Sequence, residues 1–462
     1  MFGDRMRSDA DELAARAEDA AGRLRDAGVH GIVLPYVDTA GVTRIKTVPT
    51  ARLARAARWG VGMSPVFDVF LTDDSITASE HVGGPDGDLR LVPDLDRLTT
   101  LAAQPGWAWA PVDRYSQAGD PWPTCQRGFA RAMVERAAAA GLTFKTAIEV
   151  EWALGRAGTD EFVPACTGPA YGATRLIELS DYARDLLAAL DAQGVEVEQL
   201  HPEYADAQFE LSVAARDPVG AADDSLLVRQ TIRAVAHRHG LRPSFAPSVL
   251  AGRVGNGGHV HLSVARERRN LFSGGPGPYG LTDEAQAATA GILELLPALL
   301  AIGAPSVASY LRLVPSHWAG AYACWGHETR EAALRLVTGD AGEQESAANL
   351  EVKCFDLAAN PYLLFGALIA AVLDGMRQGL RLPPPVTGDP AALSPGELAE
   401  RGIRRLPTTL DDAAQALSGC PPLRDAMGDV LTGAVLAVRR AEAQRFREVP
   451  DEDVAAALRW VY

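Results

Sequence analysis

The chain has 462 residues, of which 47% are hydrophobic and 22% charged, and its formal net charge at pH 7 is −15. This length supplies enough apolar material for a large buried core and for two or more domains. The acidic excess argues against a general nucleic-acid binder, which needs a basic surface, so we expect no nucleic-acid partner.

From the N-terminus, residues 9–27 predict a helix with one apolar stripe that stops at Gly28. Residues 31–49 then alternate apolar and polar around Asp38-Thr39-Ala40-Gly41, which predicts a β-hairpin. The stretch that follows is rich in turns as far as residue 115. We therefore predict a small α+β domain over residues 1–115.

Residues 116–462 predict a second, larger domain in which helices and strands alternate. A helix over residues 125–140 leads into a β-prone run that carries Glu149 and Glu151. Further helices are expected at 181–191 and 223–239, and strands at 195–200, 208–213 and 259–265. The segments 266–279 and 382–395 are punctuated by Gly and Pro and predict surface loops.

The most apolar later stretches are residues 281–304 and 361–373. The first is interrupted by Glu294 and Pro297 and the second is too short to cross a bilayer, so both predict buried helices. Five scattered cysteines without a Cys-x-x-Cys pair favour a reducing compartment over a disulfide framework or a zinc finger. No secretory signal is visible at the start, and we expect a cytoplasmic protein with no membrane contact.

Glu149 and Glu151 are the strongest single sign of a functional site. They stand two residues apart in Thr146-Ala147-Ile148-Glu149-Val150-Glu151-Trp152, so in a strand both carboxylates point to the same face. Two adjacent carboxylates repel and raise each other's pKa unless a cation lies between them, which points to a metal or to a function. A solvated strand face is the alternative interpretation.

Later stretches add groups of the same chemistry. They are Glu203 and Glu210 in one segment, His259 and His261 after Gly255-Asn256-Gly257-Gly258, and Glu351 in Asn349-Leu350-Glu351-Val352-Lys353. In order and spacing this series resembles the glutamine synthetase family, and the resemblance runs over most of the chain. It implies a small N-terminal β-grasp domain followed by a large glutamine-synthetase-type catalytic α/β domain.

The resemblance also implies a chemistry, an assembly and a set of metal ligands. The family uses ATP to convert the γ-carboxylate of glutamate to a γ-glutamyl phosphate, which a nitrogen nucleophile then attacks. It builds each site from two subunits, so a homo-oligomer is expected, most simply a dodecamer of two hexameric rings. Two or more Mg²⁺ or Mn²⁺ ions per site suit such oxygen-rich ligands. The matching ligands are Glu151, Glu203 and Glu210 for one metal, and Glu149, His259 and Glu351 for the other.

Further residues match nucleotide and substrate contacts of the family. His261, Ser263 and Arg335 match contacts to ATP, and Arg330 matches the cation that stabilises the transferring phosphate. Gly255 and Arg312 match contacts to the amino-acid substrate, Arg312 as a bidentate partner of its α-carboxylate. A tight turn at Gly255, a satisfied core histidine and surface salt bridges of the two later arginines are the alternative interpretations.

Three departures from the family pattern concern the substrates, and the first two concern the nitrogen substrate. Trp318 stands where ammonia-using synthetases carry a flap glutamate, and Gly62-Met63-Ser64-Pro65 stands where they carry Asp-Gly-Ser-Ser. Lys353 replaces an arginine near the substrate, which changes a forked donor into a point charge. These features are similar to the glutamine-synthetase-like branch that contains γ-glutamylamide ligases.

The departures predict that glutamate is joined to a primary amine other than ammonia. An indole in place of a carboxylate predicts a site poor in negative charge, and we therefore expect a small monoamine, with ethanolamine first. A γ-glutamylpolyamine synthetase is the second choice. An ammonia-dependent glutamine synthetase and a non-catalytic nitrogen sensor are further alternatives, although a sensor should have lost metal ligands.

Overall fold

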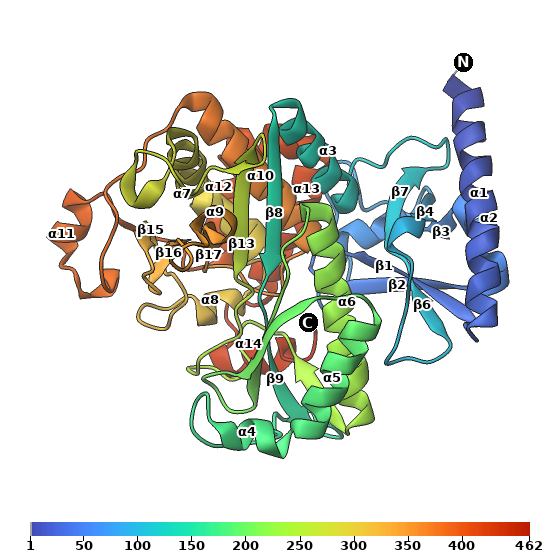
Figure 1. Cartoon of the computed structure of the whole chain (residues 1–462), viewed down its shortest axis with the longest axis horizontal. Coiled ribbons are helices and arrows are strands. Elements are labelled where there is room, and N and C mark those ends of the chain that lie inside the picture. Colours follow the sequence, from blue (N-terminus) through green and yellow to red (C-terminus); the bar gives the residue numbers. More distant parts are fainter. Residues whose placement is uncertain (1) are drawn as a thin grey trace.

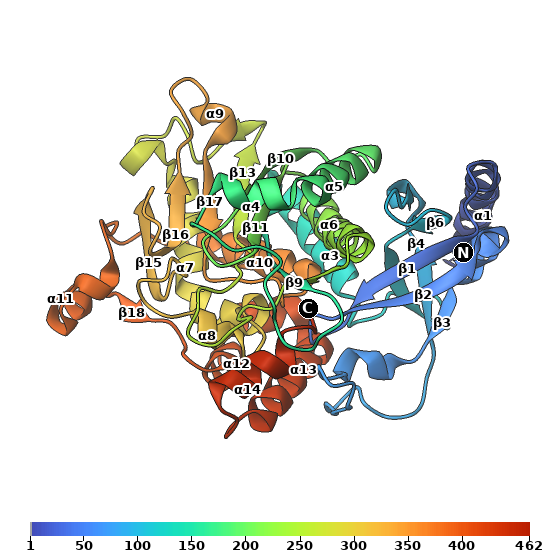
Figure 2. The same ribbon diagram turned by 90° about the horizontal axis from the view of Figure 1, so that it is seen from below.

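The computed structural model describes residues 2–462. The N-terminal part of the chain lies at one end of the molecule, beside a larger part that contains the seven-stranded sheet and one of the two four-stranded sheets (Figure 1). Seen from below, α12 to α14 gather on one side of the larger part, and the N-terminal part again lies at one end (Figure 2). The fold class predicted from the sequence, a small α+β unit followed by a large α/β unit, is confirmed.

The N-terminal part contains two small sheets, with strand orders β2-β1-β6-β5 and β3-β4-β7. β1 is buried along its whole length, whereas its antiparallel neighbour β2 is only partly covered, so β2 forms the edge of its sheet. Leu24, Ile32, Leu53 and Leu91 belong to the apolar core of this part. Its elements are α1 (Phe2–Asp26), β1 (Gly31–Val37), β2 (Thr43–Pro49), α2 (Leu53–Trp59), β3 (Val61–Met63), β4 (Leu89–Pro93), β5 (Thr99–Thr100), β6 (Trp107–Trp109) and β7 (Val112–Ser116).

The larger part contains a four-stranded sheet, β10-β11-β9-β12, and a seven-stranded sheet, β14-β13-β17-β16-β15-β18, in which β8 also pairs with β13. The consecutive strands β8 and β9 belong to different sheets, so the chain crosses from one sheet to the other between them. The strands are β8 (Leu142–Ile148), β9 (Val150–Arg156), β10 (Val197–Pro202), β11 (Gln208–Val213), β12 (Leu241–Ser244), β13 (Val260–Arg266), β14 (Arg269–Asn270), β15 (Tyr322–His327), β16 (Ala332–Val337), β17 (Asn349–Val352) and β18 (Arg404–Arg405).

The two most apolar helices, α7 and α10, cross at a pair of glycines. A Cβ at Gly291 of α7 would lie 2.3 Å from the carbonyl oxygen of Ala371, and one at Gly375 of α10 would lie 2.3 Å from that of Ala287. Only glycine therefore allows the two backbones to approach this closely. The helices of this part are α3 (Gln126–Ala139), α4 (Ala173–Glu178), α5 (Ser180–Ala192), α6 (Pro218–Arg238), α7 (Asp283–Gly303), α8 (Ser309–Arg312), α9 (Gln344–Ala347), α10 (Pro361–Gln378), α11 (Pro395–Glu400), α12 (Leu410–Ser418), α13 (Pro421–Arg445) and α14 (Asp451–Leu458).

The two apolar stretches are buried helices, as predicted. Within residues 2–462, α7 is the one helix that is long and apolar enough to cross a membrane. However, 72% of its most apolar 18-residue stretch is buried inside the protein. In α10, the Asn360 side chain accepts hydrogen bonds from the first free backbone N–H groups, Pro361 follows it, and Gly379 ends the helix in a left-handed conformation. These are the start and stop signals that a sequence of this kind encodes.

One predicted element is wrong in detail. Glu149 and Glu151 do not share a strand, because β8 ends at Ile148 and β9 begins at Val150. Glu149 is the residue between them, and its backbone N–H donates to the carbonyl oxygen of His259 at 3.0 Å. The apolar alternation continues through this bend, which is why the sequence pattern does not reveal it.

Candidate active site

A pocket of ≈590 Å³ opens between the two sheets of the larger part. Its walls come from β9, β10, β11, β16 and β17 and from the loops around residues 253–259 and 312–318. All but two of the site residues predicted from the sequence line it: Glu149, Glu151, Glu203, Glu210, Gly255, His259, Arg312, Trp318, Arg330, Arg335, Glu351 and Lys353. The fold therefore brings together side chains that are far apart in the sequence.

Glu149 lies between two histidines. Its carboxylate is 2.9 Å from Nδ1 of His259 and 3.1 Å from Nε2 of His261. Burial opposes ionisation of Glu149, but the hydrogen bonds from the two imidazoles outweigh it and hold its pKa well below the ordinary value. The bend that separates β8 from β9 thus leaves Glu149 facing the same pocket as Glu151.

Glu151 holds the glycine-rich loop against β9. Its Oε2 accepts hydrogen bonds from the Gly257 backbone N–H and from Nε2 of Gln208, both at 2.8 Å. Gln208 also donates to the Gly255 carbonyl oxygen at 3.0 Å. A Cβ at Gly257 would lie 2.6 Å from Nε2 of His259 and 2.7 Å from Oε1 of Glu151, so the loop can approach this closely only with glycine there.

The β10–β11 pair supplies the next acids. Antiparallel register places Glu210 opposite His201 on one side and opposite Glu151 on the other. His201 Nε2 lies 3.4 Å from Glu210 and its Nδ1 3.7 Å from Glu203. Burial, followed by repulsion from Glu151 and Glu210, raises the pKa of Glu203 to about 7.

The turn that follows β10 rests on a buried arginine. Arg175 is 2% exposed, and its guanidinium donates to the carbonyl oxygens of Glu203 at 2.7 Å and of Ala205 and Gly168 at 2.5 Å. The backbone N–H of Tyr204 donates to the Glu203 carboxylate at 2.9 Å. Arg175 therefore positions both Glu203 and Tyr204 without lining the pocket itself.

Glu351 is the most strongly paired acid of the site. It is buried, with Lys353 Nζ at 2.9 Å from one oxygen and Arg335 Nη1 at 3.0 Å from the other. Burial alone would raise its pKa, but the Lys353 ammonium and then His259 and His261 outweigh burial and lower it to about 2. Arg335 stands opposite Glu351 in the β16–β17 register, so the sheet itself fixes this pair.

The remaining cations differ in their environment. Arg312 is 6% exposed and donates to the carbonyl oxygens of Lys353 at 3.2 Å and Phe355 at 3.3 Å, and its Nη2 lies 3.1 Å from Nε2 of His259. Arg330 is exposed at the pocket wall and makes no ion pair with any residue of the described part of the chain. Its charge is therefore free to meet an anionic ligand.

His261 and Ser263 do not line the pocket. His261 lies on β13, where its Nδ1 is 2.8 Å from Oδ1 of Asn349. Ser263 is two residues further along the same strand, opposite Lys145 of β8. Glu149 meets the chain at His259, just before β13, and both residues lie further along the strand. A nucleotide role for them would therefore require a ligand that extends past the carboxylate cluster.

The donor set fits divalent cations. Three groups of side chains have ligand atoms within 4.8 Å of one another: Glu149, Glu210 and His259; Glu149, His261 and Glu351; and His201, Glu203 and Glu210. These groups cut across the two ligand sets expected from the sequence, which remain predictions. Carboxylate oxygens and imidazole nitrogens suit Mg²⁺ or Mn²⁺. Burial and then repulsion from Glu151 and Glu210 raise the pKa of Glu203, and a bound cation would offset that repulsion.

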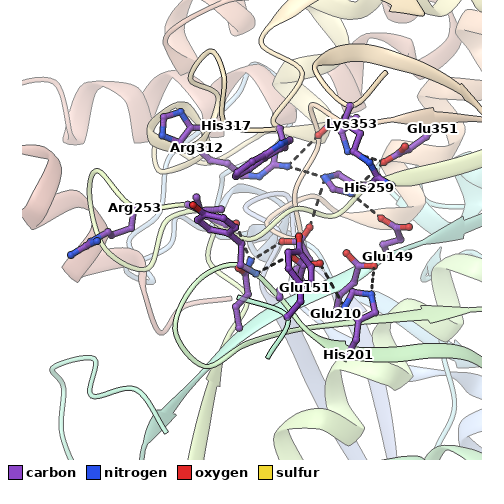
Figure 3. Close-up of a pocket in the computed structure, with 18 of the residues that line it drawn as sticks. Glu149, Glu151, His201, Glu210, Arg253, His259, Arg312, His317, Glu351 and Lys353 are labelled. Atoms are coloured by element: carbon purple, nitrogen blue, oxygen red, sulfur yellow. Dashed lines mark hydrogen bonds and ion pairs between the residues drawn. The ribbon is translucent and has the colours of Figure 1, made fainter. Parts of the chain in front are cut away.

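Two aromatic side chains line the pocket as a pair. Trp318 and Tyr204 pack with their ring centroids 4.9 Å apart, whereas Tyr171 lies beside His201 at a centroid distance of 6.3 Å. In Figure 3, Arg253 and His317 lie on the side away from Glu149, Glu210 and His201. The pocket therefore has a charged, ligand-rich end and an aromatic end.

Sequence reasoning missed several of these residues. His201 and Gln208 stand in the segment that carries Glu203 and Glu210, so their spacing on β10 and β11 could have drawn attention to them. Gly257 was visible only as part of a glycine-rich loop. Nothing in the sequence around Arg175 signals its contacts, because its partners are backbone carbonyl groups.

Comparison with known proteins agrees with this geometry. The glutamine synthetase catalytic domain model matches residues 123–456. A γ-glutamylpolyamine synthetase of Streptomyces coelicolor is 61% identical over 97% of both chains, and a glutamate–methylamine ligase of Methyloversatilis universalis is 29% identical over 94% of this chain and 97% of the relative. A crystal structure of a glutamine synthase homologue superposes with a TM-score of 0.84 at 32% identity, over 94% of this chain and 99% of that one.

Proposed function

The chain belongs to the glutamine synthetase family, and from this membership and the pocket we propose that it is an ATP-dependent carbon–nitrogen ligase that joins the γ-carboxylate of glutamate to a primary amine of a polyamine. The observation that carries the choice of amine is the 61% identity over 97% of both chains to a relative named as a γ-glutamylpolyamine synthetase. The glutamate–methylamine ligase among the relatives also supports an amine in place of ammonia.

The proposal replaces our first expectation of ethanolamine, which neither of the two relatives named above supports. That expectation rested on Trp318 making the site poor in negative charge. In the structure Trp318 packs on Tyr204, with their ring centroids 4.9 Å apart, and both residues line the pocket. The aromatic pair offers apolar surface and does not exclude an amine that carries further ammonium groups.

The proposed reaction has two steps. An oxygen of the glutamate γ-carboxylate attacks the γ-phosphorus of ATP, which releases ADP and forms γ-glutamyl phosphate. The neutral amine nitrogen then attacks the acyl carbon, the carbon–oxygen bond to phosphate breaks, and the nitrogen loses a proton. The products are the γ-glutamylamide, phosphate and ADP.

Each substrate group would be held by a different set of residues. Arg312 and Gly255 would hold the amino-acid end of glutamate, with Lys353 beside it, while Arg330 and Arg335 would face the transferring phosphate. His261 and Ser263 would contact the nucleotide. Bound divalent cations would neutralise the phosphate oxygens, which is what phosphoryl transfer requires. The chain has candidate ligands for them in Glu149, Glu151, Glu203, Glu210, His259 and Glu351.

A ring oligomer and a cytoplasmic location remain proposals drawn from the family. The alternative of a non-catalytic nitrogen sensor is disfavoured because all six candidate ligand positions carry usable ligands and line one pocket. The alternative of an ammonia-dependent synthetase is disfavoured by Trp318, which brings no negative charge to the place of an ammonium-binding acid.

The test is ADP release by the purified protein with glutamate, ATP and Mg²⁺. Ammonium, methylamine, ethanolamine, putrescine and spermidine are compared at equal concentration, with the product identified by mass spectrometry. We expect the polyamines to give the highest kcat/KM and ammonium a low one. Equal efficiency with ammonium and with every amine would overturn the choice of substrate, and no ADP release with any of them would overturn the ligase assignment.

Trp318 gives a second test. Trp318→Ala should raise the KM for the amine more than the KM for ATP, and Trp318→Phe should restore most of the loss because it keeps an aromatic face. Unchanged amine kinetics in Trp318→Ala would contradict the place given to this residue.

A further inference from the structure

A second pocket, of ≈450 Å³, adjoins the aromatic end of the reaction pocket. Five residues line both of them: Tyr204, Arg253, Val254, His317 and Trp318. None of the residues assigned above to glutamate, ATP or metal binding lines the second pocket. It therefore shares a wall with the place of the amine, and none of the residues that would hold the other ligands lines it.

The Tyr204–Trp318 pair forms the boundary between the two pockets, and both residues are held in place. The Trp318 backbone N–H donates to Oε1 of Glu331 at 3.0 Å, and Trp318 has a φ of 56°, which is unusual for a residue other than glycine. Arg175 holds the carbonyl groups on each side of Tyr204. Aromatic faces held at this point would make apolar contacts with the methylene groups of an amine substrate. They would also make a cation–π contact with an ammonium group that lies over a ring.

The walls of the second pocket suit an aminoalkyl chain. Phe162, Val249, Leu250 and Val254 supply apolar surface, and the carboxylate of Asp206, 59% exposed, stands at the same wall. Arg175 lies 3.6 Å from Asp206. Arg253, the cation of the second pocket, is an exposed residue of the rim that the two pockets share.

Resting on the proposed ligase function, we propose that the second pocket binds the distal aminoalkyl segment of the amine substrate, with its methylene groups between the apolar walls and its far ammonium at Asp206. The nitrogen that reacts then lies on the Glu203 side of the Tyr204–Trp318 pair, and the rest of the molecule extends past this pair. The pocket thereby selects diamines and longer polyamines over monoamines of equal length.

The experiment compares putrescine with butan-1-amine, which has the same four carbons and lacks the second ammonium. The readout is the ratio of their kcat/KM values, measured as ADP release with glutamate and ATP. Asp206→Asn should lower this ratio about tenfold, the size expected for a lost charged hydrogen bond. Leu250→Trp, which narrows the pocket, should lower kcat/KM for spermidine more than for butan-1-amine.

Asp160→Asn is the matched control, because it removes one carboxylate from a fully exposed position near Phe162 and should leave the ratio unchanged. Turnover of both amines with a ratio near one, or with a ratio that Asp206→Asn does not alter, would overturn this inference and leave the ligase function standing. No turnover with any amine would overturn the proposed function and this inference with it.

Discussion

Replacing Arg175 with methionine tests whether the turn after β10 organises the amine end of the site. Methionine keeps much of the volume but removes every donor from a side chain that is 2% exposed. The carbonyl groups of Gly168, Glu203 and Ala205 then lose hydrogen bonds of 2.5, 2.7 and 2.5 Å to a charged donor. Such bonds contribute about 1.5–3 kcal/mol each, and water can reach part of this turn, so we expect a loss of about 3 kcal/mol in the free energy of unfolding.

The functional effect should be specific to the amine. Without Arg175, Glu203 and Tyr204 lose their fixed position, and a displacement of about 1 Å can lower a rate up to a hundredfold. We expect the KM for the amine to rise more than the KM for ATP, because no Arg175 contact reaches the proposed nucleotide residues. Urea unfolding at one protein concentration and steady-state kinetics with each substrate varied give the two readouts.

Arg184→Met on α5 is the matched control. Among residues 2–462 this arginine pairs only with Asp181 and Asp185, and its side chain is 67% exposed, so its loss should leave the unfolding midpoint and the kinetics unchanged. If Arg175→Met is as stable as the Arg184→Met control and keeps the wild-type KM for the amine, the reasoning about this turn is wrong.

Three further predictions follow from the site and the family. Gly257→Ala should abolish turnover and keep the native circular dichroism spectrum, because its Cβ would fall 2.6–2.8 Å from His259, Glu151 and Arg312; an active variant would contradict the close approach of the loop. Glu149→Ala, Glu203→Ala and Glu351→Ala should each weaken Mn²⁺ binding by calorimetry and abolish ADP release, and normal metal binding in all three would refute the ligand assignment. Native mass spectrometry should find an assembly of several 49.0 kDa chains, most simply twelve, and full activity of a monomer would argue against a shared site.

The helices and strands of this chain could be predicted from short stretches of its sequence. The strand predicted at 208–213 matches β11, the helix predicted at 181–191 lies within α5, and the hairpin at 31–49 matches β1 and β2. The helix predicted at 9–27 extends further towards the N-terminus, and β10 runs two residues beyond its expected end. Apolar periodicity and cap residues report on backbone conformation, so they place elements well and their ends less well.

The chemistry of the site was also visible in the sequence, because residue types and their order identify the family. The acids, the two histidines and the arginines could be named without coordinates, and the structure places all of them except His261 in one pocket. The division of the carboxylates into two metal sets, which the resemblance implies, stays a prediction, because it depends on distances across two sheets with an ion bound.

Contacts between distant segments were decided only by the tertiary structure. Three features join parts of the chain that are far apart in the sequence: the change of sheet at Glu149, the Tyr204–Trp318 boundary and the second pocket behind it. The local sequence pattern of one part does not indicate which other part it will contact. Arg175 is the clearest case, because it binds carbonyl groups that every residue possesses. A sequence specifies which side chains are present and how each segment folds, whereas the packing of the segments determines which of those groups meet.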